Sequence, residues 1–167
     1  RACIEPIESG WESVDWERGC HDYGYFAQSC LGLTLHDGQV TWLTNSSSRE
    51  NVLVTGNRWG KSFVSAVKLV HHAVYRPRPL QFDSAPYRLL TASITQDQAG
   101  IIFKSAVRMA RQSPVIEPLI DVITRSPYPR MEFSNGSCIE ARSTQNRGEY
   151  LLGQDYDLVI FDEVAFE

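Results

Sequence analysis

The octapeptide Thr55-Gly56-Asn57-Arg58-Trp59-Gly60-Lys61-Ser62 is the most informative part of this 167-residue chain. A Val-Leu-Val run precedes it and predicts a strand over 52–55 that is buried on both faces. Apolar residues at three-and-four spacing follow it and predict a helix over 61–75. A glycine-rich loop between a strand and a helix is typical of a site that binds phosphate groups.

The residue types of this loop suit ATP and Mg²⁺. Small residues let backbone N–H groups surround a polyphosphate, while the following helix directs its positive end toward it. Lys61 would supply a point charge to the β- and γ-phosphates, and the Ser62 hydroxyl would ligate Mg²⁺. One departure from the usual pattern is that Thr55 stands where a glycine is expected, five positions before Gly60. A glycine-rich turn that only caps a helix is the alternative interpretation.

Arg58 lies inside the loop, where its charge has two interpretations. A guanidinium beside the phosphates can neutralise charge as the γ-phosphoryl group departs, which would make Arg58 catalytic. It can equally brace the loop, and the residues leave both roles open.

The remaining segments predict an α/β domain. Strands are expected at 87–92 and 157–161, the latter buried, and Thr95 is expected to cap a helix that runs to about Ser113. A short helix from Pro114 through 120–124 is also expected. Asn135-Gly136 predicts a two-residue hairpin turn between 131–134 and 137–141, because both residues tolerate positive φ. The expected architecture is a mainly parallel sheet flanked by helices, formed by residues 46–167, with an N-terminal extension over residues 1–45.

Two carboxylates follow the last predicted strand. Asp162 and Glu163 would lie at the carboxyl edge of the sheet, where open α/β sheets bind ligands. Asp162 would hold Mg²⁺ through water beside Ser62, and Glu163 would polarise the attacking water as a general base. Alone, such a pair is more often a strand end that reaches solvent; after a phosphate loop, it predicts ATP hydrolysis.

Composition sets limits on the class of protein. A hydrophobic content of 43% with 22% charged residues predicts one globular domain and excludes wholesale disorder. The net charge of −4 does not by itself indicate a nucleic-acid partner, although arginine pairs at 76 and 78 or at 108 and 111 could contact phosphates or simply face solvent. Four irregularly spaced cysteines indicate neither zinc nor a disulfide framework, which suits a reducing cytosol. No run of apolar residues is long enough to predict a membrane-spanning segment.

These motifs together resemble the large terminase subunits of tailed double-stranded DNA phages, which are ATP-driven genome-packaging motors. The similarity covers about residues 35–167. It includes the Arg- and Trp-bearing loop, the Leu35-His36-Asp37-Gly38-Gln39 segment, Asn135-Gly136-Ser137, Arg147-Gly148 and the strand that ends at Asp162-Glu163.

The resemblance implies further roles. Gln39 would read the adenine edge, and Arg147 would be an arginine finger that acts on a neighbouring subunit, with Arg142 as its rival. The fold would be that of a RecA-like (ASCE) P-loop NTPase. Partners would be double-stranded DNA, sibling subunits in a ring, the portal protein and the small terminase subunit, in the host cytoplasm at the procapsid portal. The chain is expected to be a fragment, and the nuclease half of such proteins is not expected within it.

Two other functions compete with this prediction. A helicase-like or DNA-remodelling ATPase would share the same core, and a nuclease domain encoded after residue 167 would distinguish the packaging motor from it. A module that uses ATP only as a structural ligand is the non-enzymatic alternative. Glu163 argues against that alternative, because a pure binder needs no carboxylate beside the γ-phosphate.

Overall fold

The computed structural model describes residues 14–77, 86–126, 128–144 and 153–162. Its centre is a five-stranded sheet in the order β2-β3-β4-β1-β5. The strands are β1 Tyr87–Ser93, β2 Ile120–Thr124, β3 Arg130–Phe133, β4 Ser137–Ser143 and β5 Leu158–Phe161. β1 pairs in parallel with β4 and β5, whereas β2, β3 and β4 form antiparallel pairs. The α/β class is therefore confirmed, with a mixed sheet that is parallel around β1.

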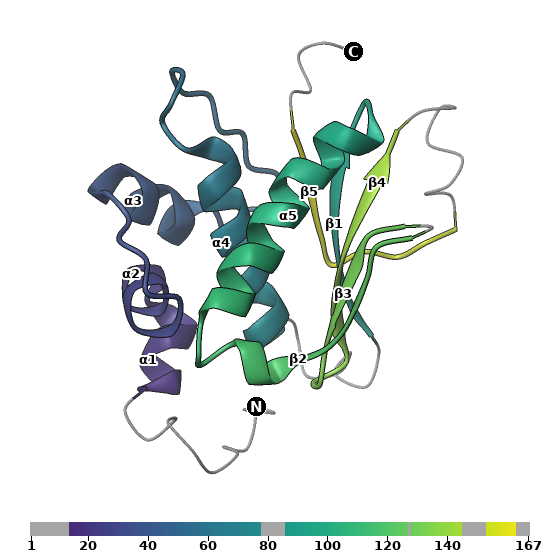
Figure 1. Cartoon of the computed structure of the whole chain (residues 1–167). Coiled ribbons are helices and arrows are strands. Elements are labelled where there is room, and N and C mark those ends of the chain that lie inside the picture. The colour runs from purple at the N-terminus through teal and green to yellow at the C-terminus, as the bar shows by residue number, and fades with distance from the viewer. Residues whose placement is uncertain (1–13, 78–85, 127, 145–152, 163–167) are drawn as a thin grey trace.

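Two helices cover one face of this sheet (Figure 1). Helix α4, Lys61–Tyr75, and helix α5, Gln96–Gln112, share one hydrophobic core with the inward residues of β1, β3 and β4. Both helices match the predicted spans. Thr95 caps α5 as expected, because its side chain accepts a hydrogen bond from the backbone N–H of Gln98.

The described part of the N-terminal segment packs against α4 through short helices. These are α1 Trp16–His21, α2 Tyr23–Tyr25, the π-helix η1 Phe26–Cys30 and α3 Asp37–Asn45. Phe26, Ala27, Cys30 and Leu43 belong to the same core as α4. The segment and the α/β unit thus share apolar contacts. None of the helices in the described ranges has the length and hydropathy needed to span a bilayer.

The predicted strand at 52–55 does not form. Residues 51–56 have no regular secondary structure, and the side chains of Val52 and Val54 are 85% and 87% exposed. Within the described residues this segment joins no ladder, and the sheet ends at β5. A valine-rich run needs a pairing strand and a covered face to become a buried strand, and this segment has neither.

The segment after Pro114 is also different from its prediction. In place of a continuing helix, a 3₁₀ turn, η3 Glu117–Leu119, leads directly into β2. Residues 120–124 read Ile-Asp-Val-Ile-Thr, and β-branched side chains fit a pleated strand better than a helix. β2 therefore extends the antiparallel part of the sheet beside β3.

The predicted hairpin is present, but its turn is different. The N–H of Gly136 bonds to the carbonyl of Phe133, so Ser134 and Asn135 are the central residues of the turn. Only Gly136 of the predicted Asn-Gly pair has positive φ, at 80°. The side chain of Asn135 instead donates to the carbonyls of Ala73 and Val74 at the end of α4, at 2.9 and 3.0 Å. This tertiary contact accounts for the difference.

The last strand, β5, is at the predicted place but is only partly covered. Val159 and Phe161 are 36% and 55% exposed, because the helices cover only the face that carries Leu158 and Ile160. The prediction that this run is buried was wrong for one face.

Candidate functional site

The loop before α4 contains two residues with positive φ. Gly60 adopts φ of 92° and Arg58 a φ of 64°, so the chain turns sharply into the first helical residue, Lys61. A side chain at Gly60 would lie 2.7 Å from the Nε2 of Gln39, whereas one at Gly56 would meet nothing within 4 Å. Gly60 is therefore the glycine that this conformation requires. The side chain of Arg58 is exposed.

Polar groups at the start of α4 have few partners among the described residues. No side chain makes a capping hydrogen bond at Gly60 in the described structure. The ammonium of Lys61 donates to the carbonyl of Thr55 at 3.2 Å, which folds this side chain back across the loop. The hydroxyl of Thr55 is buried and has no partner within the described part of the chain. A 15-residue helix with an uncapped N-terminus and a lysine beside it is a suitable anion site.

Gln39 lies directly against this loop. Its Nε2 donates to the carbonyl of Trp59 at 3.0 Å, and its Oε1 accepts from the N–H of His36 at 3.2 Å. His36 caps α3 and packs edge-on against the ring of Trp59, with ring centroids 5.0 Å apart. The sequence singled out Gln39, but His36 was missed as a contact of the loop. Its position three residues before a glutamine, as in a capping box, was the available signal.

Asp162 lies at the carboxyl end of β5. Its backbone N–H bonds to the carbonyl of Ala92 at 3.1 Å, and its own carbonyl accepts from the hydroxyl of Ser93 at 3.2 Å. β1 and β5 are parallel, so their carboxyl ends meet at one edge of the sheet. Figure 1 shows that the loop before α4 lies toward this same end of the molecule.

Arg142 is held within the sheet. On the face of β4 away from the helices, its guanidinium bonds to the fully buried carboxylate of Glu140 at 3.0 Å and stacks on Tyr128. Arg88 and Arg130 bind the same carboxylate at 3.2 and 3.3 Å. Burial raises the pKa of Glu140, but hydrogen bonds from Arg142 and Arg88 outweigh burial and bring the pKa below its ordinary value. Because Arg142 neutralises a buried charge, the structure gives it a clear structural role.

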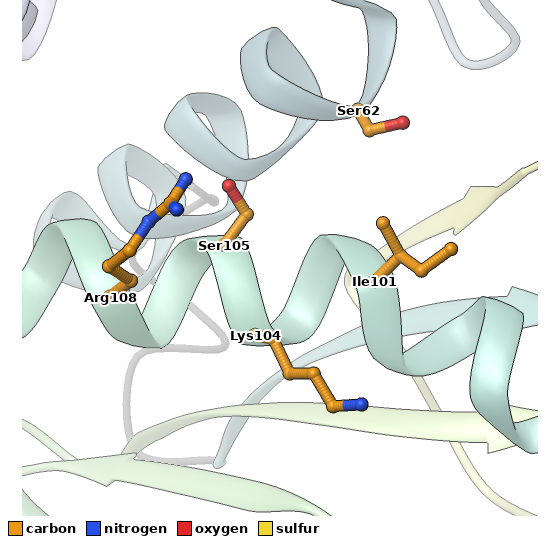
Figure 2. A pocket seen from close by; sticks show the side chains of 5 residues that line it. All are labelled: Ser62, Ile101, Lys104, Ser105 and Arg108. Atoms are coloured by element: carbon orange, nitrogen blue, oxygen red, sulfur yellow. The ribbon is translucent and has the colours of Figure 1, made fainter.

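A shallow pocket lies between the start of α4 and α5 (Figure 2). It has a volume of about 400 Å³ and is lined by Ser62, Ile101, Lys104, Ser105 and Arg108. Two cations of α5 thus line the same hollow as Ser62. Lys104 was not singled out from the sequence, because a lysine on the exposed side of an amphipathic helix has no distinctive local signal.

Two predicted site residues, Glu163 and Arg147, lie outside the described part of the chain. Within the described ranges, no group of three His, Cys, Asp or Glu side chains forms a metal cluster. The structure therefore brings Gln39, Trp59, Gly60 and Lys61 together, and places Asp162 at the same edge of the fold.

The chain resembles known phage proteins in both sequence and structure. Residues 52–166 match the family model for the N-terminal part of the large terminase subunit of T4-like viruses. The large terminase ATPase domain of Thermus phage P74-26 is similar at a TM-score of 0.62 and 24% identity, and an arginine-to-alanine mutant of it at 0.65 and 24%. These alignments cover 83% of this chain and 57% of the other.

The large terminase of bacteriophage HK97 is similar at a TM-score of 0.65 and 19% identity, over 87% of this chain and 31% of that protein. The chain thus spans little more than half of the Thermus phage domain and about a third of the HK97 protein. A comparison with curated proteins found no match. Since the family model covers more than half of the sequence, including both the phosphate loop and the acidic pair, this chain belongs to the large terminase subunit family.

Proposed function

We propose that this chain is the ATPase part of a viral genome-packaging motor, which hydrolyses ATP with Mg²⁺ to move double-stranded DNA into a procapsid. The observation that carries the proposal is the start of α4. There, a left-handed Gly60, an uncapped helix N-terminus and the ammonium of Lys61 form an anion site in a chain of the terminase family. Membership of that family supports the DNA-packaging role.

The residues of the loop fit a triphosphate. Residues 55–62, from Thr55 to Ser62, would surround the phosphates with backbone N–H groups, and Lys61 would exchange the carbonyl of Thr55 for a phosphate oxygen. An oxygen of a charged ligand is a stronger partner for an ammonium than a neutral carbonyl. The present contact of Lys61 is thus one that a nucleotide can replace.

The acidic pair would divide the remaining work. Ser62 and Asp162 would hold Mg²⁺, which when bound neutralises charge on the phosphates. Glu163 would orient and deprotonate the attacking water. Both carboxylates follow β5 in the sequence. The end of β5 is tied to β1 through Asp162 and Ser93, and the loop before α4 lies toward this end of the molecule.

Two arginines are candidates for stabilising the charge on the departing γ-phosphoryl group. Arg58 is exposed within the loop, and Arg147 would act from a neighbouring subunit. Arg142 is the weaker candidate, because its departure would leave the carboxylate of Glu140 buried with less compensation.

The proposed setting follows from the family. Sibling subunits would form a ring, its partners would be double-stranded DNA, the portal protein and a small terminase subunit, and the motor would work in the host cytoplasm at the procapsid portal. Residues 46–167 would form the ATPase core and residues 1–45 an extension that stabilises α4.

The direct test is ATP binding and hydrolysis with and without Mg²⁺ and duplex DNA. Glu163→Gln should abolish turnover and leave nucleotide affinity nearly unchanged, because the amide keeps the size of the side chain but cannot accept a proton. Turnover by Glu163→Gln equal to that of the unchanged chain would remove Glu163 as the base. The same comparison in a longer chain that includes the region after residue 167 controls for groups supplied by that region.

A mixing experiment tests Arg147. Arg147→Ala protein is added to Asp162→Asn protein, so that each can supply the group that the other lacks. Recovered hydrolysis in the mixture supports action across a subunit boundary. Activity no greater than the sum of the two separate variants contradicts it.

A further inference from the structure

Both polar atoms of the Gln39 side chain bind protein groups at the phosphate loop. It is 6% exposed, its amide nitrogen donates to the carbonyl of Trp59, and its amide oxygen accepts from the N–H of His36. We propose that Gln39 is a positioning residue which directs the backbone N–H of Gly60 toward the phosphates. This inference rests on the proposed function and differs from the expected contact of Gln39 with adenine.

The argument begins with the geometry of one peptide unit. The carbonyl of Trp59 and the N–H of Gly60 belong to the same planar peptide group. In a trans peptide these two groups point in opposite directions. Because Gln39 holds the carbonyl toward α3, the N–H of Gly60 points away from α3.

His36 provides a second contact to the same peptide. Its Nε2 lies 3.5 Å from the carbonyl of Trp59, and its ring packs against the indole. His36 is itself held by the reciprocal capping box at the start of α3, in which its Nδ1 accepts from the N–H of Gln39 at 3.2 Å. The first turn of α3 therefore contacts the loop through two side chains, Gln39 and His36.

Gly60 allows Gln39 to come this close to the loop. A Cβ at this position would lie 2.7 Å from the Nε2 of Gln39, which is shorter than a van der Waals contact. The positive φ of Gly60 and the absence of a side chain serve the same contact. A donor that is already oriented in the free protein costs less to order when a phosphate binds, and this lowers the dissociation constant.

A ligand without a base separates this role from adenine recognition. We would measure the binding of tripolyphosphate, ATP and GTP to the unchanged chain and to Gln39→Met by titration calorimetry with Mg²⁺. Methionine has a similar length and no charge, and it removes the hydrogen bond to Trp59. The affinity for all three ligands should fall by a common factor of about ten, the value of one well-placed hydrogen bond.

Matched variants test for a general loss of structure. Gln112→Met makes the same replacement at an exposed glutamine at the end of α5 and should leave all three affinities unchanged. His36→Asn keeps a side-chain acceptor at the cap of α3 but removes the imidazole ring that packs against Trp59. It should lower the affinity for all three ligands about threefold. Thermal unfolding without ligand shows whether each variant is folded.

The outcomes are distinct. Loss of ATP affinity alone, with tripolyphosphate and GTP unchanged, would overturn the inference and assign Gln39 to adenine. Unchanged binding of all three ligands by folded Gln39→Met would also overturn it. If the unchanged chain bound none of the three, the proposed function itself would fail.

Discussion

Two lysines on α4, two turns apart, have opposite relations to the fold. Lys61 begins the helix, is partly exposed, and donates a hydrogen bond to the carbonyl of Thr55. Lys68 is 4% exposed and donates to both the carbonyl and the hydroxyl of Ser46, at 2.7 and 2.6 Å. One ammonium is held by a contact that a ligand can replace, and the other joins two helices.

The difference arises from what surrounds each lysine. Burial beneath the N-terminal segment lowers the pKa of Lys68 to about 8. Its ammonium sits at the end of α3, where the carbonyl of the C-cap residue Ser46 attracts a cation, and it faces the ring of Trp42 at 5.2 Å. The same side chain is therefore a structural clamp in the middle of α4 and a candidate binding group at its start.

The largest effect is expected at Lys61. Lys61→Ala should lower ATP hydrolysis by about a hundredfold or more, because a charge that is present in the transition state is lost. Its free energy of unfolding should change by less than about 0.5 kcal/mol, since the side chain supports no buried contact network. Steady-state hydrolysis and urea unfolding measure the two quantities. Equal triphosphate affinity in both proteins would remove Lys61 from the site.

Lys68 should show the reverse pattern. Lys68→Ala should lower the free energy of unfolding by about 2–3 kcal/mol, because it removes the two hydrogen bonds that Ser46 accepts from the ammonium and opens a cavity beside Trp42. Lys68→Met fills the same space, so its free energy of unfolding should fall by less than that of Lys68→Ala. Nucleotide affinity of the folded variants should stay within about twofold of the original, within experimental scatter. A Lys68→Ala protein as stable as the original would contradict the clamp.

The buried half of α4 should also make stability depend on pH. Burial lowers the pKa of His71 to about 4 and that of His72 to about 3, so both are neutral in the folded chain at pH 6.5, the ordinary pKa of histidine. As pH falls from 6.5 toward 4, the unfolded chain takes up protons that the folded chain does not. Stability should therefore fall by about 1.4 kcal/mol per pH unit for each histidine.

A single variant tests the contribution of His71 to this pH dependence. His71→Phe keeps an aromatic ring among Tyr23, Phe26 and Tyr75 but cannot titrate. Urea unfolding at several pH values gives the free energy of unfolding as a function of pH. Between pH 6.5 and 4, its slope should be smaller in His71→Phe by the contribution of one proton. Identical slopes in the two proteins would show that His71 titrates normally in the fold.

The sequence correctly predicted the helices and turns whose formation depends on interactions within a few residues. The helical spacing of α4, the Thr95 cap of α5 and the glycine of the hairpin turn all act within a few residues, and the structure confirms all three elements. The strand expected at 52–55 failed because a buried strand depends on a pairing partner and a covered face. β2 was missed because its β-branched residues were assigned to the end of a helix, although they pair with β3.

The candidate site divides in the same way. Gly60, Lys61 and Ser62 could be named from their order in the chain, because the chemistry of a phosphate loop lies in adjacent residues. Gln39 and His36 contact the carbonyl of Trp59, which lies about twenty residues further along the chain. Arg142 binds Glu140 because strand pleating puts both on one face of β4, beside the neighbouring arginines.

The sequence by itself determined helices α4 and α5, the hairpin and the candidate residues of the phosphate loop, because periodicity, capping and loop chemistry are short-range. Only the tertiary structure decided which polar side chains are already engaged. Lys68 has no distinctive signal in the sequence, and Gln39 and Arg142 were expected there to contact nucleotide. In the fold, each of the three side chains makes a buried or loop-supporting contact. Burial makes an unpaired polar group costly, and burial depends on packing between segments that are distant in the chain.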